Sequence, residues 1–250
     1  MKKIALILAL GMGLSLLAGC SGSSTGTTTA AETTTAADTT EAVTEEESAE
    51  EVITGGWEIQ DATPLEMDDA ATEAFEKAAE GLVGATLEPI AVIATQIVAG
   101  TNYCFLVKST PVVPDAVSHY AFAYVYADLE GNAEITGTKD IEIDVDAAST
   151  EVESTEGLAG GWTIAEFDGT GVDDADVIES ALEEFVGSDI VPIARIATQV
   201  VAGENYCFVV AQTPVSPDAQ TNIELAYVYK DLSGKCEFIG FTVLDYMPEE

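Results

Sequence analysis

The stretch ATQIVAGTNYCF at residues 94–105 returns almost unchanged as ATQVVAGENYCF at residues 197–208. In each copy two apolar runs flank a Gly and an Asn, a pattern that predicts two antiparallel strands joined by a tight turn. The residues before each Gly are apolar, although hairpin turns usually carry polar side chains. Two interpretations are open: the tips are exposed for insertion into a groove of another protein, or a neighbouring loop buries them.

The two copies belong to an internal repeat in which equivalent residues lie 103 positions apart. The matched pairs include Pro89 and Pro192, Tyr124 and Tyr227, and Gly131 and Gly234. The repeat predicts one domain at residues 52–145 and a second at residues 158–250, each within the size range of domains that fold alone. A polar, acidic linker at residues 146–157 joins them.

Each repeat has the same predicted order of elements. A short strand follows a pair of glycines, and a helix then begins at Asp68 or Asp69 in the first repeat and at Asp173 or Asp174 in the second. Longer strands follow, in the first repeat at about 89–99, 102–108, 119–127 and 134–143. The expected fold class is α+β, with one helix packed across a four- to five-stranded antiparallel sheet in each repeat. The strand at 119–127 is apolar on both faces, so the face that the helix covers stays open.

The motifs QIVAG and QVVAG, each followed two residues later by Asn-Tyr, resemble the first binding loop of the cystatins, and the stefin branch in particular. The resemblance extends over nearly all of both repeats. It implies two tandem cystatin-like domains that inhibit papain-like cysteine proteases. In that family the N-terminal Gly, the first hairpin and a second hairpin form a wedge that enters the active-site cleft.

The resemblance implies protease contacts at corresponding positions of both repeats. In the first repeat these residues are Gly55, Gly56, Gln96, Ile97, Val98, Ala99, Gly100, Leu129 and Gly131. In the second repeat they are Gly160, Gly161, Gln199, Val200, Val201, Ala202, Gly203, Leu232 and Gly234. Glu130 and Ser233 depart from the pattern, because stefins carry Pro at this place. Glu130 puts a charge where the family is apolar.

A wedge of this kind inhibits because it fills the groove on both sides of the nucleophile without presenting an aligned scissile bond. Glycine in the first hairpin lets the backbone approach the enzyme closely. Each apolar tip residue contributes about 1–2 kcal/mol when it is fully covered. The alternative function is a non-inhibitory surface module for binding or adhesion.

An enzyme is not expected, because Cys104 and His119 are the only thiol and imidazole of the first repeat and Asn222 stands at the position of His119 in the second. No catalytic residue, metal site or cofactor is predicted, since the cysteines lack metal-ligand spacing. Residues 168–174 faintly suggest a calcium loop, but helix capping is the preferred interpretation. Cys207 and Cys236 are expected to lie about 10 Å apart, too far to bridge, and the state of Cys104, Cys207 and Cys236 is left open.

The first 20 residues have the features of a targeting segment. Lys2 and Lys3 precede an apolar run at residues 4–17, and the segment ends in Leu-Ala-Gly-Cys at Cys20, which resembles a bacterial lipobox. The resemblance implies lipid attachment (palmitate) at Cys20 and a cell-surface protein anchored on the extracytoplasmic face of a bacterial membrane. An ordinary secretory signal is the alternative. The Thr-, Ser- and Glu-rich residues 21–51 predict a disordered stalk.

The charge balance restricts the partners. The chain has 45 acidic and 8 basic residues, a formal net charge of −37. Nucleic acids and anionic membrane surfaces repel such a chain, so no nucleic-acid partner is expected, and membrane contact is assigned to the lipid anchor alone. The charge favours at most a basic partner. The resemblance to the cystatins implies that this partner is a papain-like cysteine protease. The oligomeric state is left open.

Overall fold

The structure, a computed structural model, describes residues 55–60, 67–144, 161–167 and 171–248. The predicted signal segment with Cys20, the stalk at 21–51, the linker at 146–157 and Gly160 lie outside the described residues. Within the described ranges, no helix has the length and apolar character needed to cross a membrane.

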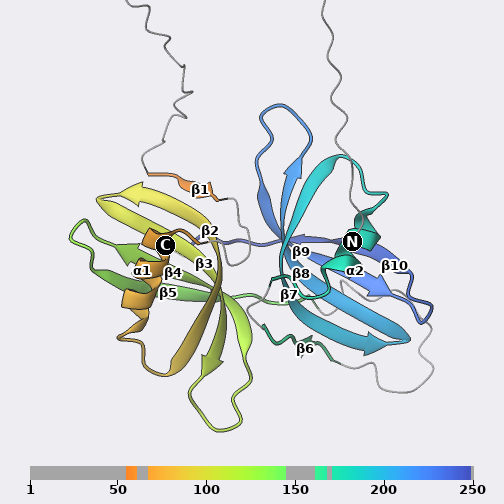
Figure 1. The fold of residues 1–250 in the computed structure, drawn as a ribbon, viewed down its shortest axis with the longest axis horizontal. Coiled ribbons are helices and arrows are strands. Elements are labelled where there is room, and N and C mark those ends of the chain that lie inside the picture. The colour runs from red at the N-terminus through yellow and green to blue at the C-terminus, as the bar shows by residue number, and fades with distance from the viewer. Residues whose placement is uncertain (1–54, 61–66, 145–160, 168–170, 249–250) are drawn as a thin grey trace, which may run out of the picture. The chain divides into compact units, whose positions relative to one another are not determined.

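The first repeat forms a five-stranded antiparallel sheet with the strand order β1-β2-β3-β4-β5 (Figure 1). A single helix, α1, stands between β1 and β2 in the chain. The elements are β1 Trp57–Ile59, α1 Asp69–Ala79, β2 Ala85–Val98, β3 Gly100–Pro111, β4 His119–Ala127 and β5 Ala133–Asp140.

The second repeat forms a separate sheet of the same design, with the strand order β10-β9-β8-β7-β6. Its helix, α2, follows the two-residue strand β6. The elements are β6 Thr163–Ile164, α2 Ala175–Leu182, β7 Ser188–Val201, β8 Gly203–Pro214, β9 Asn222–Lys230 and β10 Cys236–Val243.

The predicted fold class is wrong. The described chain is mostly β, with two five-stranded antiparallel sheets and two short helices, and not an α+β pair of cystatin-like domains with a helix packed across each sheet. The helices have 11 and 8 residues, whereas β2 and β7 have 14 residues each. At these lengths α1 spans about 16 Å and β2 about 45 Å. A helix of this size covers only part of one face.

The apolar character of both faces of β4 has a direct explanation, because successive side chains of a strand point to opposite faces. Ala121, Ala123 and Val125 lie in a buried cluster with α1. Tyr120 and Phe122 lie in another cluster, which contains side chains of both sheets. We call this second cluster the shared core. Its buried members are Ile90, Ala91, Ile93, Ala94, Cys104, Leu106, Tyr120, Phe122 and Tyr124 from the first repeat, and Ile193, Ala194, Ile196, Ala197, Cys207, Val209, Ala211, Ile223, Leu225 and Tyr227 from the second.

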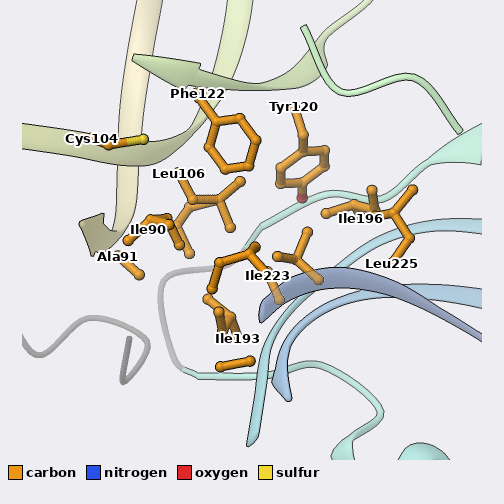
Figure 2. Close-up of a cluster of buried hydrophobic side chains, with 14 of the residues drawn as sticks. Ile90, Ala91, Cys104, Leu106, Tyr120, Phe122, Ile193, Ile196, Ile223 and Leu225 are labelled. Carbon is orange, nitrogen blue, oxygen red and sulfur yellow. The ribbon is translucent and has the colours of Figure 1, made fainter. Parts of the chain in front are cut away.

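In the shared core, Leu106 and Phe122 of the first sheet lie close to Ile193 and Ile223 of the second (Figure 2). All four side chains are at most 1% exposed. The α2 side of the second sheet has a cluster of its own, in which Val177 and Ile178 pack with β8 and β9. Each sheet therefore has a helix on part of one face and contacts the other sheet through the opposite face.

Irregularities in β2 and β7 increase what these strands contribute to the shared core. The register of β2 against β3 shifts at Ile90 and again at Ile93, and β7 shifts at the equivalent Ile193 and Ile196. A β-bulge places an extra residue in one strand and changes which side chains share a face. As a result, all four of these isoleucines are fully buried in the shared core.

Polar contacts between the repeats are partly reciprocal. The hydroxyl of Tyr124 donates to the carbonyl oxygen of Tyr246 at 3.1 Å. The hydroxyl of Tyr227, the residue equivalent to Tyr124, accepts from the backbone N–H of Asp144 at 3.2 Å. The segment that follows the last strand of each repeat thus contacts the sheet of the other repeat. Reciprocal contacts of this kind are typical of an interface between two copies of one unit.

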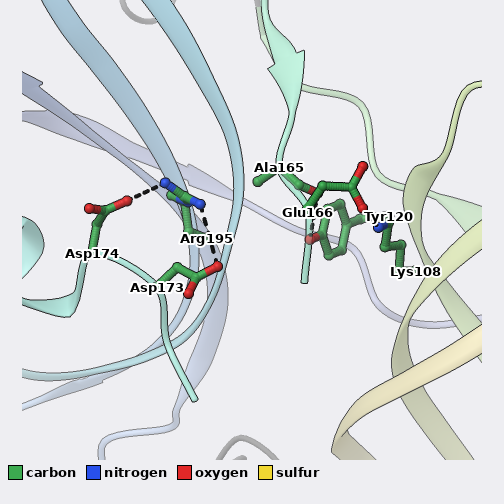
Figure 3. Close-up of polar contacts among 7 residues, drawn as sticks. All are labelled: Lys108, Tyr120, Ala165, Glu166, Asp173, Asp174 and Arg195. Atoms are coloured by element: carbon green, nitrogen blue, oxygen red, sulfur yellow. Dashed lines mark hydrogen bonds and ion pairs between the residues drawn. The ribbon is translucent and has the colours of Figure 1, made fainter. Parts of the chain in front are cut away.

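One group of polar contacts between the repeats has no counterpart at the equivalent positions. The ammonium group of the buried Lys108 pairs with Glu166, and the hydroxyl of Tyr120 donates to the carbonyl oxygen of Ala165 at 3.1 Å (Figure 3). The residue equivalent to Lys108 is Ala211, which belongs to the shared core. This ion pair therefore satisfies a buried charge at one side of the interface only.

The helices begin differently in the two repeats. Asp68 is the N-cap of α1, as predicted, and its Oδ1 accepts from the backbone N–H of Ala71 at 2.6 Å. Asp174 holds the equivalent place in α2 but makes no capping hydrogen bond with its side chain. Its carboxylate pairs with Arg195 of β7, and Asp173 lies 3.4 Å from the same guanidinium (Figure 3). Ion pairs to β7 therefore replace the predicted side-chain cap of α2.

Removal of a large side chain from the shared core should destabilise the protein strongly. We expect Phe122→Ala to lower the free energy of unfolding by about 3–5 kcal/mol, because the lost ring leaves a cavity in a fully buried site. Urea unfolding followed by circular dichroism measures the change, with the exposed Val117→Ala as the control. A loss below about 1 kcal/mol would contradict the burial of Phe122 between the sheets.

Candidate functional site

The hairpin tips that the sequence singles out are exposed. β2 ends at Val98 and β3 begins at Gly100, so only Ala99 separates the two strands. Ile97 and Val98 are 41% and 42% exposed, and Val200 in the second hairpin is 67% exposed. Of the two interpretations of the tips, the described residues therefore favour the exposed one.

The turn between β4 and β5 presents a second exposed apolar side chain. Leu129 is 80% exposed, and its equivalent Leu232, between β9 and β10, is 87% exposed. Asp128 organises the first turn, because its Oδ1 accepts from the backbone N–H groups of Glu130 at 3.0 Å and Asn132 at 2.7 Å. The side chain of Asn132 also donates to Asp128, at 2.7 Å. These hydrogen bonds, that of the Asn132 side chain foremost, hold the pKa of the Asp128 carboxyl below its usual value.

Asp231 does the same in the second repeat. Its Oδ1 accepts from the backbone N–H groups of Ser233 and Lys235 at 2.8 and 2.9 Å, and from the hydroxyl of Ser233 at 2.6 Å. The hydrogen bond from the Ser233 hydroxyl is the main reason that the pKa of the Asp231 carboxyl is lowered. A carboxylate thus holds each turn in shape, two residues before the place where stefins carry a proline.

The N-terminal glycine, the hairpin tip and the Leu129 turn lie side by side in the first repeat. Trp57 is paired with Gln96, and the side-chain amide of Gln96 donates to the carbonyl oxygen of Gly55 at 2.9 Å. On the other side of the tip, the Tyr126 hydroxyl, one residue before the end of β4, donates to the carbonyl oxygen of Ala99 at 2.6 Å. The three predicted segments therefore meet at one end of the sheet. We call these residues, 55–56, 97–99 and 128–131, tip surface 1.

The second repeat repeats this arrangement at residues 200–202 and 231–234, with Gly161 before β6; we call it tip surface 2. Tyr229 donates through its hydroxyl to the carbonyl oxygen of Ala202, as Tyr126 does to Ala99. The amide of Asn205 donates to Gln199 at 2.8 Å, matching the 2.7 Å hydrogen bond from Asn102 to Gln96. Gly160, which the resemblance adds to the N-terminal side of this surface, lies outside the described residues.

The glycines of the tips have an internal role. A Cβ atom on Gly100 would lie 2.3 Å from the carbonyl oxygen of Ala127, and one on Gly203 would lie 2.4 Å from that of Lys230. Their φ angles are +126° and +127°, a region that residues with a Cβ rarely adopt. The close approach that requires glycine is therefore between the tip and its own neighbouring strand. A substitution at either glycine would alter folding as well as any contact with a partner.

Tyr126 and Tyr229, which the sequence reasoning missed, hold the carbonyl groups at the tips. The sequence reasoning also assigned no role to Asp128 and Asp231, which order the second turn of each repeat. All four residues recur at the spacing of the repeat, and this repetition was the available signal, because an identical polar residue beside a turn often serves the turn itself.

The other chemically notable residues do not form a site together. Cys104 is fully buried in the shared core, and burial raises the pKa of its thiol. It is paired with Tyr124, whereas His119 is paired with Ser109. Five residues along β4 separate these positions, a distance of about 16 Å. His119 instead lies 3.1 Å from Asp140. The three cysteines in the described ranges are free.

None of the known protein-family models matches the chain, and no curated protein matches it at a significant level.

The role of Gly203 can be measured. We expect Gly203→Ala to destabilise the protein by at least about 1–2 kcal/mol, because alanine is strained at this positive φ and its Cβ meets backbone. Gly240→Ala is the matched control in the same sheet, since a Cβ there meets nothing within 4 Å. Thermal unfolding of both variants gives the comparison. Equal stability of the two would show that the tip tolerates a side chain.

Proposed function

We propose that each tip surface inserts into the active-site groove of a papain-like cysteine protease and inhibits the enzyme reversibly by occlusion. The observation that carries the proposal is the set of exposed apolar turns side by side at one end of each sheet. The proposal rests on these turns and not on the predicted fold class. It also keeps the lipid anchor at Cys20, which would hold the inhibitor on the outer face of a bacterial membrane.

The tip surfaces have the energetic properties that such insertion requires. Burial of an exposed aliphatic side chain contributes about 1–2 kcal/mol, and Ile97, Val98 and Leu129 would be covered together in a groove. The turns are already ordered by the Asp128 carboxylate and the Tyr126 hydroxyl, so little conformational entropy is lost on docking. Three side chains of this kind would together contribute about 3–6 kcal/mol to the complex.

The same hydrogen bonds explain why a protease would be occupied by the tip without cleaving it. Attack by the catalytic thiolate requires a carbonyl group held in line at about 3–3.5 Å. The carbonyl oxygen of Ala99 accepts a hydrogen bond from the hydroxyl of Tyr126, and Ile97 and Val98 are paired with residues of β3. Their peptide groups are therefore committed to the hairpin and are not free to adopt the geometry of a substrate.

Contacts between the repeats favour simultaneous use of both surfaces. Tyr120, which touches Ala165, lies at the end of β4 away from tip surface 1. Six residues, or about 20 Å, separate it from Tyr126. Ala165 donates its backbone N–H to Ile196, four residues before Val200 of tip surface 2. The part of the second sheet close to tip surface 2 therefore contacts the end of the first sheet that is distant from tip surface 1.

A titration of papain with the full chain tests the proposal. We expect two enzymes to be inhibited per chain, one in Val200→Asp or Ile97→Asp, and none in the double variant, because a carboxylate at the tip opposes burial in the groove. Val243→Asp is the control, since Val243 is 65% exposed but lies at the end of β10 away from the turn.

Absence of inhibition at micromolar protein would contradict the proposal and favour the non-inhibitory binding module. Unchanged stoichiometry in the tip variants would show that inhibition arises from another part of the chain.

A further inference from the structure

Glu130 and Ser233 occupy the same place in the two tip surfaces, directly after the exposed leucine. The turns around them are built alike, because Asp128 accepts from the backbone N–H of Glu130 at 3.0 Å and Asp231 from that of Ser233 at 2.8 Å. The two surfaces thus present the same backbone and the same leucine. They differ in the chemistry of the next side chain.

The Ser233 side chain is satisfied within its turn, where the hydroxyl donates to Asp231 at 2.6 Å. The carboxylate of Glu130 makes no hydrogen bond or ion pair with any residue in the part of the chain that the structure describes. Lys77, a base that reaches this turn, donates to the carbonyl oxygen of Gly131. Glu130 therefore carries an exposed and unpaired charge beside Leu129.

Other charges also lie around the first turn, because Glu73 and Glu76 of α1 and Glu80 at its C-terminal end line a pocket together with Lys77, Asp128 and Leu129. The positive charge of Lys77 is one of the influences that lower the pKa of Asp128, so these two groups offset each other. The side chain directly after Leu129 in the turn is Glu130, whose carboxylate has no ion pair among the described residues. Glu134 follows two residues after the turn, but Glu237 holds the same place in the second repeat and the two do not distinguish the surfaces.

The second turn carries no acidic side chain at the place of Glu130. Lys230 lies directly opposite Glu204 in the register of β8 and β9. Lys235 closes the turn through its backbone N–H to Asp231, and its ammonium group forms no ion pair with the residues that the structure describes. Ser233 itself is neutral. The side chain directly after Leu232 is therefore neutral, whereas the one directly after Leu129 is a carboxylate.

From this difference, and resting on the proposed function, we infer that the two surfaces bind papain-like proteases of different groove charge. Tip surface 1 fits an enzyme with a lysine or arginine beside the pocket for Leu129, because burial of a carboxylate is unfavourable unless a cation pairs with it. Tip surface 2 fits an enzyme whose wall is uncharged there. The net charge of −37 also steers the chain toward a basic partner.

Exchange of the two residues tests the inference. In the full chain with Val200→Asp, tip surface 2 is inactivated and inhibition by tip surface 1 alone is measured. In the full chain with Ile97→Asp, inhibition by tip surface 2 alone is measured. Glu130→Ser is added to the first and Ser233→Glu to the second. Inhibition constants are measured against two papain-like enzymes, one with a basic groove wall and one with an uncharged wall, at 0.05 and 0.5 M NaCl.

We expect Glu130→Ser to weaken inhibition of the basic enzyme by roughly tenfold or more and to strengthen inhibition of the uncharged one. Ser233→Glu should do the reverse, and high salt should reduce both effects. Inhibition that persists with less than a twofold effect of either exchange would overturn this inference and leave the proposed function intact. Failure of both surfaces to inhibit either enzyme would overturn both.

Discussion

The burial of one face of each sheet against the other is the interaction on which the remaining structure depends. A five-stranded sheet with a helix of 8 or 11 residues leaves most of its second face to be covered. Here the cover is the equivalent face of the second repeat. The bulges at Ile90 and Ile193, the reciprocal contacts of Tyr124 and Tyr227 and the pairing of Lys108 with Glu166 all serve this contact.

The shared core also explains where function can reside. The middle of each long strand is committed to one of two buried clusters, so the surfaces that remain available are the turns at the strand ends. Turns are exposed and variable in most proteins, and they carry binding residues when a rigid scaffold positions them. Asp128, Tyr126 and their equivalents give the turns that rigidity, while Ile97 and Leu129 supply apolar surface.

Much of the local structure could be predicted from the sequence. The internal repeat, the positions of the long strands, the hairpin before Gly100 and the cap at Asp68 all rest on short-range patterns, and the structure has them. The pairing of the sheets could not be predicted in this way. Alternation on β4 shows that Tyr120 and Ala121 are both buried, but it does not reveal that a helix covers one and a second sheet the other. The sequence reasoning assumed that a helix packed across each sheet forms the core. It did not foresee that the second sheet buries the opposite face.

The candidate site divides in the same way. The apolar tips and the exposed leucines could be found because they break the usual polarity of turns. The hydrogen bond from the Tyr126 hydroxyl, and the clash that requires glycine at position 100, could not be found from the sequence. Both depend on a strand that is distant in sequence. Asp174 shows the limit of a local signal. It stands at the N-cap position of α2, yet its carboxylate forms an ion pair with Arg195 of β7 and makes no capping hydrogen bond.

Native-state hydrogen exchange in the full chain tests most directly whether the two sheets are stabilised by one core. Leu225→Ala removes a fully buried side chain that the second repeat contributes to that core. If the sheets depend on each other, the opening free energy of the β3 amides in the first repeat should fall by about 2–4 kcal/mol, as much as that of the β8 amides. Unchanged protection in β3 with loss confined to β8 would contradict a shared core.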